Sequence, residues 1–216
     1  MVSIPKFYYK ENLNAKVAIC IPVRDLVTSA FTHSLAMLTN KCGRDNKSIT
    51  IHMNIGSEVA MQRQELVNTA LDTDCTHILW LDSDMIFPTV IIEALMSHDK
   101  DIIACNYSTR VPPHRPVAFK TFGDLDKRVF SQTGIETVDA VGMGAMLVKR
   151  SVYEKIQKPH FGVEWNNDYT SLIGEDMFFC KKAAENGYEV WVDNDTSMQI
   201  SHVGTTAFTI KGNCND

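Results

Sequence analysis

The strongest constraint on the fold is the alternation of short apolar, β-rich runs with helical patterns through the first half of the chain. Four runs are typical of strands, and three intervening stretches are typical of helices. The strand candidates cover residues 16–22, 48–54, 77–82 and 101–107, and the helix candidates cover residues 28–41, 57–71 and 88–98. This order predicts an α/β fold in which helices flank a mostly parallel central sheet.

The second half of the chain is less regular. Residues 136–150 are typical of a strand interrupted by two glycines, 174–188 of a helix, and 189–195 and 198–204 of the last strands. The length of 216 residues suits a single domain. We expect that domain to cover residues 1–216, with an N-terminal extension at 1–15 and a C-terminal tail at 205–216. The pattern also fits one domain of a larger multi-domain protein.

Composition and charge argue against several classes of protein. The formal net charge is −5 and no basic block stands out, so the sequence does not indicate a nucleic-acid surface. No stretch approaches the roughly 18 apolar residues of a transmembrane segment, and the first residues do not resemble a signal peptide. The six cysteines form no C-x-x-C pair, which favours reduced thiols. We therefore expect a cytoplasmic protein, soluble or peripheral to a membrane.

Two carboxylates end the apolar run "ILWLDSD". Asp82 and Asp84 follow the third strand candidate, and ligands of parallel sheets bind beyond the carboxyl ends of the strands. Residues i and i+2 of an extended chain point to the same side, so both side chains are expected to face one ligand. Neighbouring carboxylates repel each other, and a divalent cation would remove that conflict. The alternative is an acidic turn after a strand.

Two arginines also stand near the predicted ligand-binding edge. Arg63 falls on the apolar stripe of the helix at 57–71, where a guanidinium needs a partner. That partner is a phosphate or a carboxylate at the edge of the sheet, unless the side chain extends to water at the margin of the stripe. Arg24 and Asp25 follow the first strand, where they either contact a nucleotide or form a plain turn.

The acidic pair Glu175 and Asp176 begins the helix candidate at 174–188. Acidic side chains there are favourable through the helix dipole alone, but one of them could also remove a proton from an attacking hydroxyl. His202 follows the strand candidate's "MQIS" and is either structural or a metal ligand. Imidazole beside an aspartate suits Mn²⁺ better than Mg²⁺.

In their order and spacing, these motifs resemble the GT-A-fold, Rossmann-like glycosyltransferases of the family-2-like kind, which use nucleotide sugars. The resemblance runs from about residue 16 to residue 204. Its compact form is similar to glycosyltransferase domains of bacteria, phages and large DNA viruses such as chloroviruses. The matching stretches are "VAICIPVRD", "AMQRQELVNTAL", "THILWLDSDMIFP", "DIIACNYSTRVPP", "VGMGAMLVKRSVYEKI", "GEDMFFCKKAAENGYEVWVD" and "ISHVG".

The resemblance implies roles for particular residues. A divalent cation, Mn²⁺ or Mg²⁺, would be bound by Asp84 and His202, with Asp82 at the ribose or at a metal-bound water. Asp176, or Glu175 in its place, would be the catalytic base. The donor-binding residues would be Pro22, Arg24, Asp25, Arg63, Asp82, Ser83, Gly142 and Gly144, and the acceptor residues would be Met143, Ala145 and Trp165.

The resemblance further implies transfer of a hexose or deoxyhexose from a nucleoside diphosphate to a hydroxyl of a glycan or glycoconjugate. UDP is the favoured nucleotide and GDP the second, and an acidic base at position 176 favours inversion. For a viral protein the location would be the host cytoplasm. Two rival hypotheses stay open. A nucleotidyltransferase would usually carry a glycine-rich loop after the first strand, whereas residues 21–31 contain no glycine. The other rival is a non-catalytic sugar-nucleotide or glycan-binding module.

Overall fold

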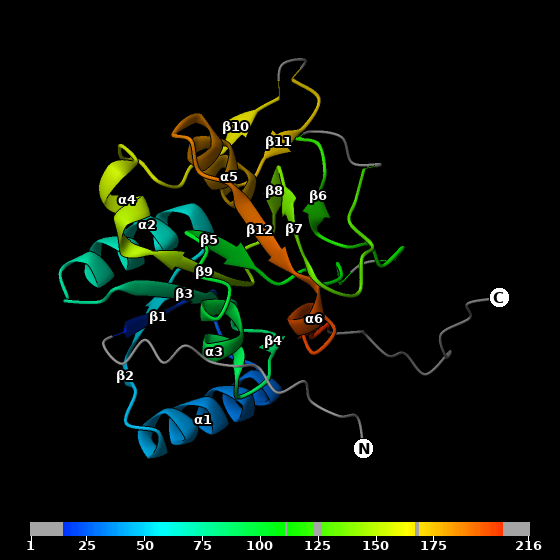
Figure 1. The fold of residues 1–216 in the computed structure, drawn as a ribbon. Coiled ribbons are helices and arrows are strands. Elements are labelled where there is room, and N and C mark those ends of the chain that lie inside the picture. Colours follow the sequence, from blue (N-terminus) through cyan, green and yellow to red (C-terminus); the bar gives the residue numbers. More distant parts are fainter. Residues whose placement is uncertain (1–14, 111, 123–126, 167–168, 205–216) are drawn as a thin grey trace.

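A seven-stranded sheet forms the centre of the protein (Figure 1). The computed structural model describes residues 15–110, 112–122, 127–166 and 169–204. From edge to edge the strands are β2 (Ser48–Ile55), β1 (Lys16–Val23), β3 (His77–Leu81), β9 (Ala145–Lys149), β5 (Ile102–Ala104), β12 (Val190–Asp193) and β7 (Ile135–Val138). Only β9 and β7 run against the direction that the other five strands share. The predicted mostly parallel sheet is confirmed.

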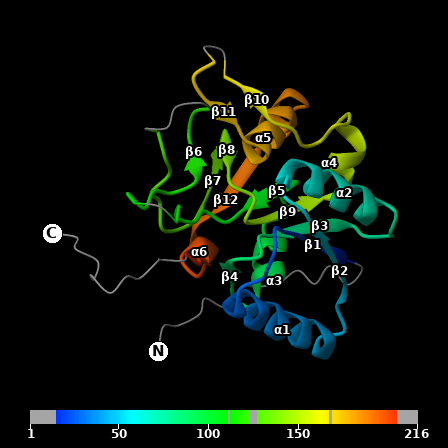
Figure 2. The same ribbon diagram turned by 180° about the vertical axis from the view of Figure 1, so that it is seen from behind.

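Helices cover both faces of this sheet (Figure 2). They are α1 (Ser29–Arg44) and α3 (Ile91–Met96) on one face, α2 (Val59–Leu71), α4 (Arg150–Lys155) and α5 (Glu175–Glu185) on the other, and the short α6 (Asn194–Ser197) after β12. Alternate residues of β1 enter the two cores: Ala18 packs on the α2 side and Ile19 on the α1 side. Burial on both faces explains why the strands are continuous apolar runs.

Three two-stranded antiparallel ribbons complete the fold. They pair β4 (Met85–Ile86) with β13 (Ser201–His202), β6 (Ala118–Phe119) with β8 (Ala140–Val141), and β10 (Glu164–Trp165) with β11 (Leu172–Ile173). The strand expected at 198–204 is present only as the two residues of β13. The chain first makes the helical turn α6, because Asp193 Oδ1 accepts a hydrogen bond of 2.9 Å from the Thr196 amide and caps it.

Residues 1–14 of the expected N-terminal extension, the expected tail at 205–216 and Cys214 lie outside the described residues. The five described cysteines are all free and buried, as reduced thiols should be. Among the helices in the described ranges, none combines the length and apolar character needed to cross a membrane.

A buried aromatic cluster supports the strand that leads into the carboxylate pair. Trp80 of β3 is fully buried and its indole Nε1 donates a hydrogen bond of 2.8 Å to the hydroxyl of Tyr153 in α4. The ring of Phe161 meets Trp80 edge to face, and Phe179 of α5 stacks on Tyr153. The cluster therefore joins β3, α4 and α5 directly beneath the carboxyl end of β3.

The Tyr153→Phe substitution tests this support. It keeps the ring but removes the acceptor of the buried Trp80 N–H, so the free energy of unfolding should fall by about 1–3 kcal/mol. Chemical denaturation of both proteins measures the difference. Tyr188→Phe, a change at a partly exposed tyrosine, is the matched control and should alter stability by less than about 0.5 kcal/mol. Equal stability of the Tyr153→Phe variant and the wild type would contradict the role of the hydrogen bond.

Candidate active site

The antiparallel strand β9 determines which residues meet at the carboxyl edge of the sheet. β9 lies between β3 and β5 and begins where these two strands end. The amide of Asp82 donates to the carbonyl of Gly144 at 3.1 Å, and the amide of Cys105 donates to the carbonyl of Ala145 at 2.8 Å. Residues forty or more positions apart are therefore joined at the edge where ligands of such sheets bind.

The two carboxylates after β3 do not face one ligand together. Residues 82–84 form a turn rather than an extended strand, with the Met85 amide donating to the Asp82 carbonyl at 3.1 Å. Asp82 therefore points to Arg63, whereas Asp84 points to Arg110 and His202. The expectation of a shared ligand was wrong because the alternation of sides holds only in an extended chain.

Arg63 is the partner of two carboxylates and not a surface contact for a nucleotide. Its side chain is 2% exposed; Nη2 lies 2.8 Å from Asp82 and Nε lies 3.2 Å from Glu175. The guanidinium also lies over the Trp80 ring, 5.3 Å from its centroid. Burial acts to lower the pKa of Arg63, but the charges of Asp82 and Glu175 raise it, so the group stays protonated. These contacts are those of a positioning residue, and the donor-binding role expected for Arg63 stays a prediction.

Asp176 lies in the first turn of α5, beside Glu175, and its pKa is raised. Its Oδ1 accepts a hydrogen bond of 2.7 Å from the Met177 amide. Burial is the main cause that raises the pKa of Asp176 to about 6, and the neighbouring charge of Glu175 adds to it. Arg63 and the Met177 amide act in the opposite direction. A carboxylate with this pKa is ionised at neutral pH and is a stronger base than an ordinary aspartate.

Tyr107, which follows β5, lies between the acidic groups and was missed in the sequence. Its hydroxyl accepts a hydrogen bond of 3.0 Å from the Gly144 amide, and its ring meets the His202 ring edge to face at 5.3 Å. Burial first, and then the charges of Asp82 and Asp176, raise the pKa of Tyr107 well above its ordinary value. The sequence signal for Tyr107 was its place as the last residue of the strand candidate at 101–107.

The glycines of the motif VGMGA leave room for Tyr107. A Cβ at Gly142 would lie 2.5 Å from the Tyr107 hydroxyl, and a Cβ at Gly144 would lie 2.8 Å from the same oxygen. Met143 and Ala145 are buried in the two cores of the sheet, at 1% and 0% exposure. Met143 lies in the turn before β9 and Ala145 begins β9, and both side chains are buried, so the acceptor contacts expected of them stay predictions.

Asp84 and His202 meet across the ribbon of β4 and β13. His202 Nε2 lies 3.4 Å from Asp84 Oδ1, and the Val203 amide donates to the Asp84 carbonyl at 2.8 Å. His202 Nδ1 lies 3.0 Å from the carbonyl of Ser108, so Nδ1 carries a proton and donates it. This leaves Nε2 directed at the carboxylate.

The chemistry of this pair suits a divalent cation as a partial set of ligands. A metal-binding imidazole commonly donates its other N–H to a carbonyl, as His202 does to Ser108. Burial acts against charge on both groups, yet their contact raises the pKa of His202 and lowers that of Asp84. No group of three histidine, cysteine or acidic side chains that could hold a metal occurs among the described residues. Ligand or water oxygens would have to complete the coordination.

The remaining predicted residues lie at the same edge with different exposure. Pro22 is buried within β1. Arg24 and Asp25 come after β1 on the surface, with Arg24 Nε 3.5 Å from Asp25 Oδ2. Ser83 is half-buried, and its carbonyl accepts the amide of the α1 cap. Trp165 is 55% exposed on the ribbon that leads into α5. For these residues the expected donor and acceptor contacts stay predictions.

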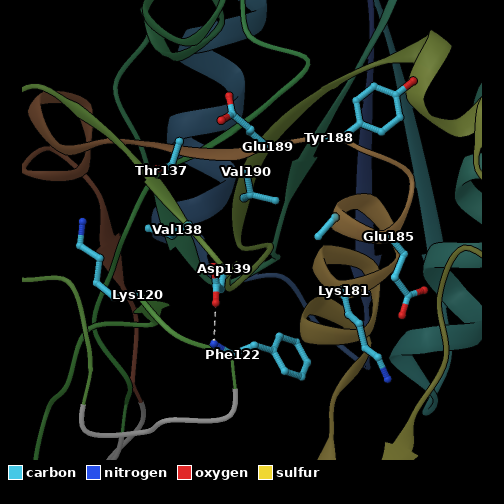
Figure 3. Close-up of a pocket in the computed structure, with 11 residues that line it drawn as sticks. Lys120, Phe122, Thr137, Val138, Asp139, Lys181, Glu185, Tyr188, Glu189 and Val190 are labelled. Atoms are coloured by element: carbon cyan, nitrogen blue, oxygen red, sulfur yellow. Dashed lines mark hydrogen bonds between the residues drawn. The ribbon is translucent and has the colours of Figure 1, made fainter.

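A hollow of about 600 Å³ lies elsewhere, between the C-terminal half of α5 and strands β7 and β12 (Figure 3). Asp139 points into it and accepts the Phe122 amide at 2.9 Å, with Lys181 and Glu185 on the wall formed by α5. None of its lining residues is one of the predicted site residues. The hollow is therefore distinct from the carboxyl edge of β3, and Asp176 lies at the opposite end of α5.

Comparison with known proteins identifies the family. The sequence model of the Anp1 family matches residues 40–213. The chain belongs to the Anp1 family. Anp1 is a GT-A-like glycosyltransferase family, so the expected glycosyltransferase class is confirmed.

Solved structures agree with the GT-A fold of this Anp1 protein. A197 from STIV shares 16% identity, with a TM-score of 0.54 over 92% of this chain and 99% of A197. The catalytic domain of Drosophila β1,4-galactosyltransferase 7 in complex with xylobiose shares 17% identity, with a TM-score of 0.52 over 88% and 71% of the two chains. A mutant of the same Drosophila enzyme, in complex with manganese, UDP-Gal and xylobiose, shares 16% identity, with a TM-score of 0.50 over 91% and 78%. At these identities the likeness concerns the fold.

The Gly144→Ala substitution tests the packing of Tyr107. The added methyl group would overlap the buried tyrosine, so stability should fall by about 1–3 kcal/mol. Gly43→Ala is the matched control, because no atom lies within 4 Å of the new Cβ in α1; it should stabilise by about 0.5–1 kcal/mol. Thermal and chemical denaturation measure both changes. A Gly144→Ala protein as stable as wild type would show that Tyr107 does not require a glycine there.

Proposed function

We propose that this Anp1 protein is a metal-dependent, inverting glycosyltransferase with Asp176 as its catalytic base. The donor is a nucleoside-diphosphate sugar, with UDP favoured over GDP, and the acceptor is a hydroxyl of a glycan or glycoconjugate. The observation that carries the proposal is the position of Tyr107. Its ring contacts the ring of His202. Burial, and then the charges of Asp82 and Asp176, raise the pKa of its hydroxyl. These contacts support a base candidate and a metal-ligand candidate at one edge of the sheet.

The chemistry follows from the groups at that edge. Asp176 removes the proton of the acceptor hydroxyl, whose oxygen attacks the anomeric carbon of the donor. The bond from that carbon to the diphosphate breaks, and its electron pair leaves with the diphosphate. Asp84 and His202 would hold a divalent cation, which when bound offsets the charge developing on the leaving diphosphate. Arg63 holds Glu175 and thereby fixes the start of α5 from which Asp176 projects.

Similar structures support the choice of metal and donor. The Drosophila galactosyltransferase 7 mutant binds manganese, UDP-Gal and xylobiose, so this fold can hold such a set of ligands. Imidazole in the ligand pair favours Mn²⁺ over Mg²⁺. The buried, free cysteines fit a cytoplasmic setting, which belongs to the same proposal. Trp165, exposed beside α5, offers a flat face for an acceptor sugar.

Calorimetric titration of UDP and GDP, each with and without Mn²⁺, tests donor class and metal together. We expect UDP to bind more tightly than GDP, and only when Mn²⁺ is present. Asp84→Ala should abolish the metal-dependent part of the affinity, because the carboxylate ligand is lost. Asp195→Ala, at a partly exposed aspartate in α6, is the matched control and should bind as wild type does. Metal-dependent binding that survives unchanged in Asp84→Ala would remove Asp84 from the metal site.

Asp176→Asn tests the base. The variant should keep donor affinity but lose transfer by about two to four orders of magnitude, because the amide cannot accept the proton. In the wild type, kcat/KM should fall about tenfold per pH unit below pH 6, since Asp176 has a pKa of about 6 and must be ionised. Transfer assays across pH measure both effects.

Stability measurements separate loss of the base from loss of the fold. Because burial raises the pKa of Asp176, its ionised form opposes folding above about pH 6. Asp176→Asn should therefore be at least as stable as wild type at pH 8, while Glu185→Gln at the exposed end of α5 should leave transfer unchanged. Full transfer activity in a folded Asp176→Asn protein would place the base elsewhere.

A further inference from the structure

Arg110 is in direct contact with the carboxylate that is the metal-ligand candidate. Its Nη1 lies 2.6 Å from Asp84 Oδ2, while His202 Nε2 approaches the other oxygen, Oδ1, at 3.4 Å. Neither sequence patterns nor the proposed mechanism assigns a role to Arg110. The two oxygens of Asp84 are thus each faced by a group that is cationic or can become cationic.

The exposure of the two partners is unequal. The side chain of Arg110 is 54% exposed, whereas that of Asp84 is 20% exposed. Asp84 is fixed by the ribbon of β4 and β13, through the bond from the Val203 amide to its carbonyl. Arg110 lies on the loop between β5 and β6, with one face toward solvent. The side chain of Arg110 is already more than half exposed and its guanidinium can leave Asp84 with little change in exposure, whereas the backbone of Asp84 is held by the ribbon.

A guanidinium at this place competes with one ligand and attracts another. A divalent cation that binds Asp84 needs the lone pairs that Arg110 now engages. A diphosphate bound to such a cation carries oxygens that a guanidinium can bind in a bidentate manner. The same arginine therefore opposes metal binding before the donor arrives and favours donor binding afterwards.

We propose that Arg110 is a cation substitute for Asp84 that exchanges the carboxylate for the donor's diphosphate when the divalent cation binds. The inference rests on the proposed function, since it needs a diphosphate donor and a metal at Asp84. No bond is made or broken in this exchange. Its role is to keep the carboxylate neutralised without a metal and to couple cation binding to nucleotide binding.

The coupling predicts opposite changes in two affinities for one substitution. In Arg110→Ala, Mn²⁺ alone should bind roughly threefold to tenfold more tightly, because a competing ion pair is removed. With saturating Mn²⁺, UDP should bind about tenfold less tightly, because a charge-assisted contact to the diphosphate is lost. Titration of free Mn²⁺ followed by electron paramagnetic resonance measures the first affinity, and calorimetry measures the second.

Two further variants act as controls. Arg115→Ala removes the same charge from an exposed position on the same loop, so it reports the effect of net charge alone and should change both affinities little. Arg110→Lys keeps the positive charge but lacks the two parallel N–H donors of a guanidinium. It should bind Mn²⁺ nearly as tightly as wild type does, and it should bind UDP less tightly than wild type. Circular dichroism of all variants confirms that they are folded.

The outcomes separate this inference from the proposed function. If wild type binds UDP or GDP with Mn²⁺ but Arg110→Ala behaves as Arg115→Ala does, the exchange is wrong and the proposed function stands. If Arg110→Ala weakens Mn²⁺ binding, Arg110 supports the metal instead of competing with it, and the inference is again overturned. If wild type binds neither Mn²⁺ nor a nucleotide, both proposals fail.

Discussion

The candidate site depends on the buried guanidinium of Arg63. This group joins three elements: it projects from α2, pairs with Asp82 at the end of β3 and pairs with Glu175 at the start of α5. Removing the guanidinium would leave both carboxylates without their cation, at a cost of about 3–5 kcal/mol. The arginine therefore fixes where α5 begins relative to β3, and with it the place of Asp176.

The carboxylates at this edge of the sheet form two groups, each with its own basic side chains. Arg63 neutralises Asp82 and Glu175 beneath the surface, while Arg110 and His202 face Asp84 nearer to solvent. Among the described residues no cation lies at contact distance from Asp176, and burial, with the charge of Glu175, raises its pKa. The same sheet edge thus holds ionised carboxylates suited to binding and one weaker acid suited to accepting a proton. Tyr107 lies between the two groups and is held by the backbone of Gly144.

Much of the fold was predictable because its physical basis is local. Apolar runs bounded by turn residues gave the parallel strands β1, β2, β3 and β5, and the acidic start of α5 was apparent from its sequence. The order of motifs also led to the GT-A-like family that the Anp1 match shows. The sequence indicated a phosphate or a carboxylate as the partner of Arg63 but did not decide between the two. Tyr107 and Arg110 were missed because an apolar residue that ends a predicted strand and an arginine in the following loop are both ordinary, and their contacts with distant residues are not encoded locally.

The sequence by itself determined the strand–helix alternation, the two apolar faces of the central parallel strands such as β1 and β3, and the types of side chain available at the strand ends. Only the tertiary structure decided which of those side chains meet. The insertion of β9 between β3 and β5 brought the glycines to Tyr107, and the turn at 82–84 sent Asp82 and Asp84 to different partners. The physical reason is that pairing across the sheet and ion pairing between distant segments depend on distances in space that local residue preferences do not encode.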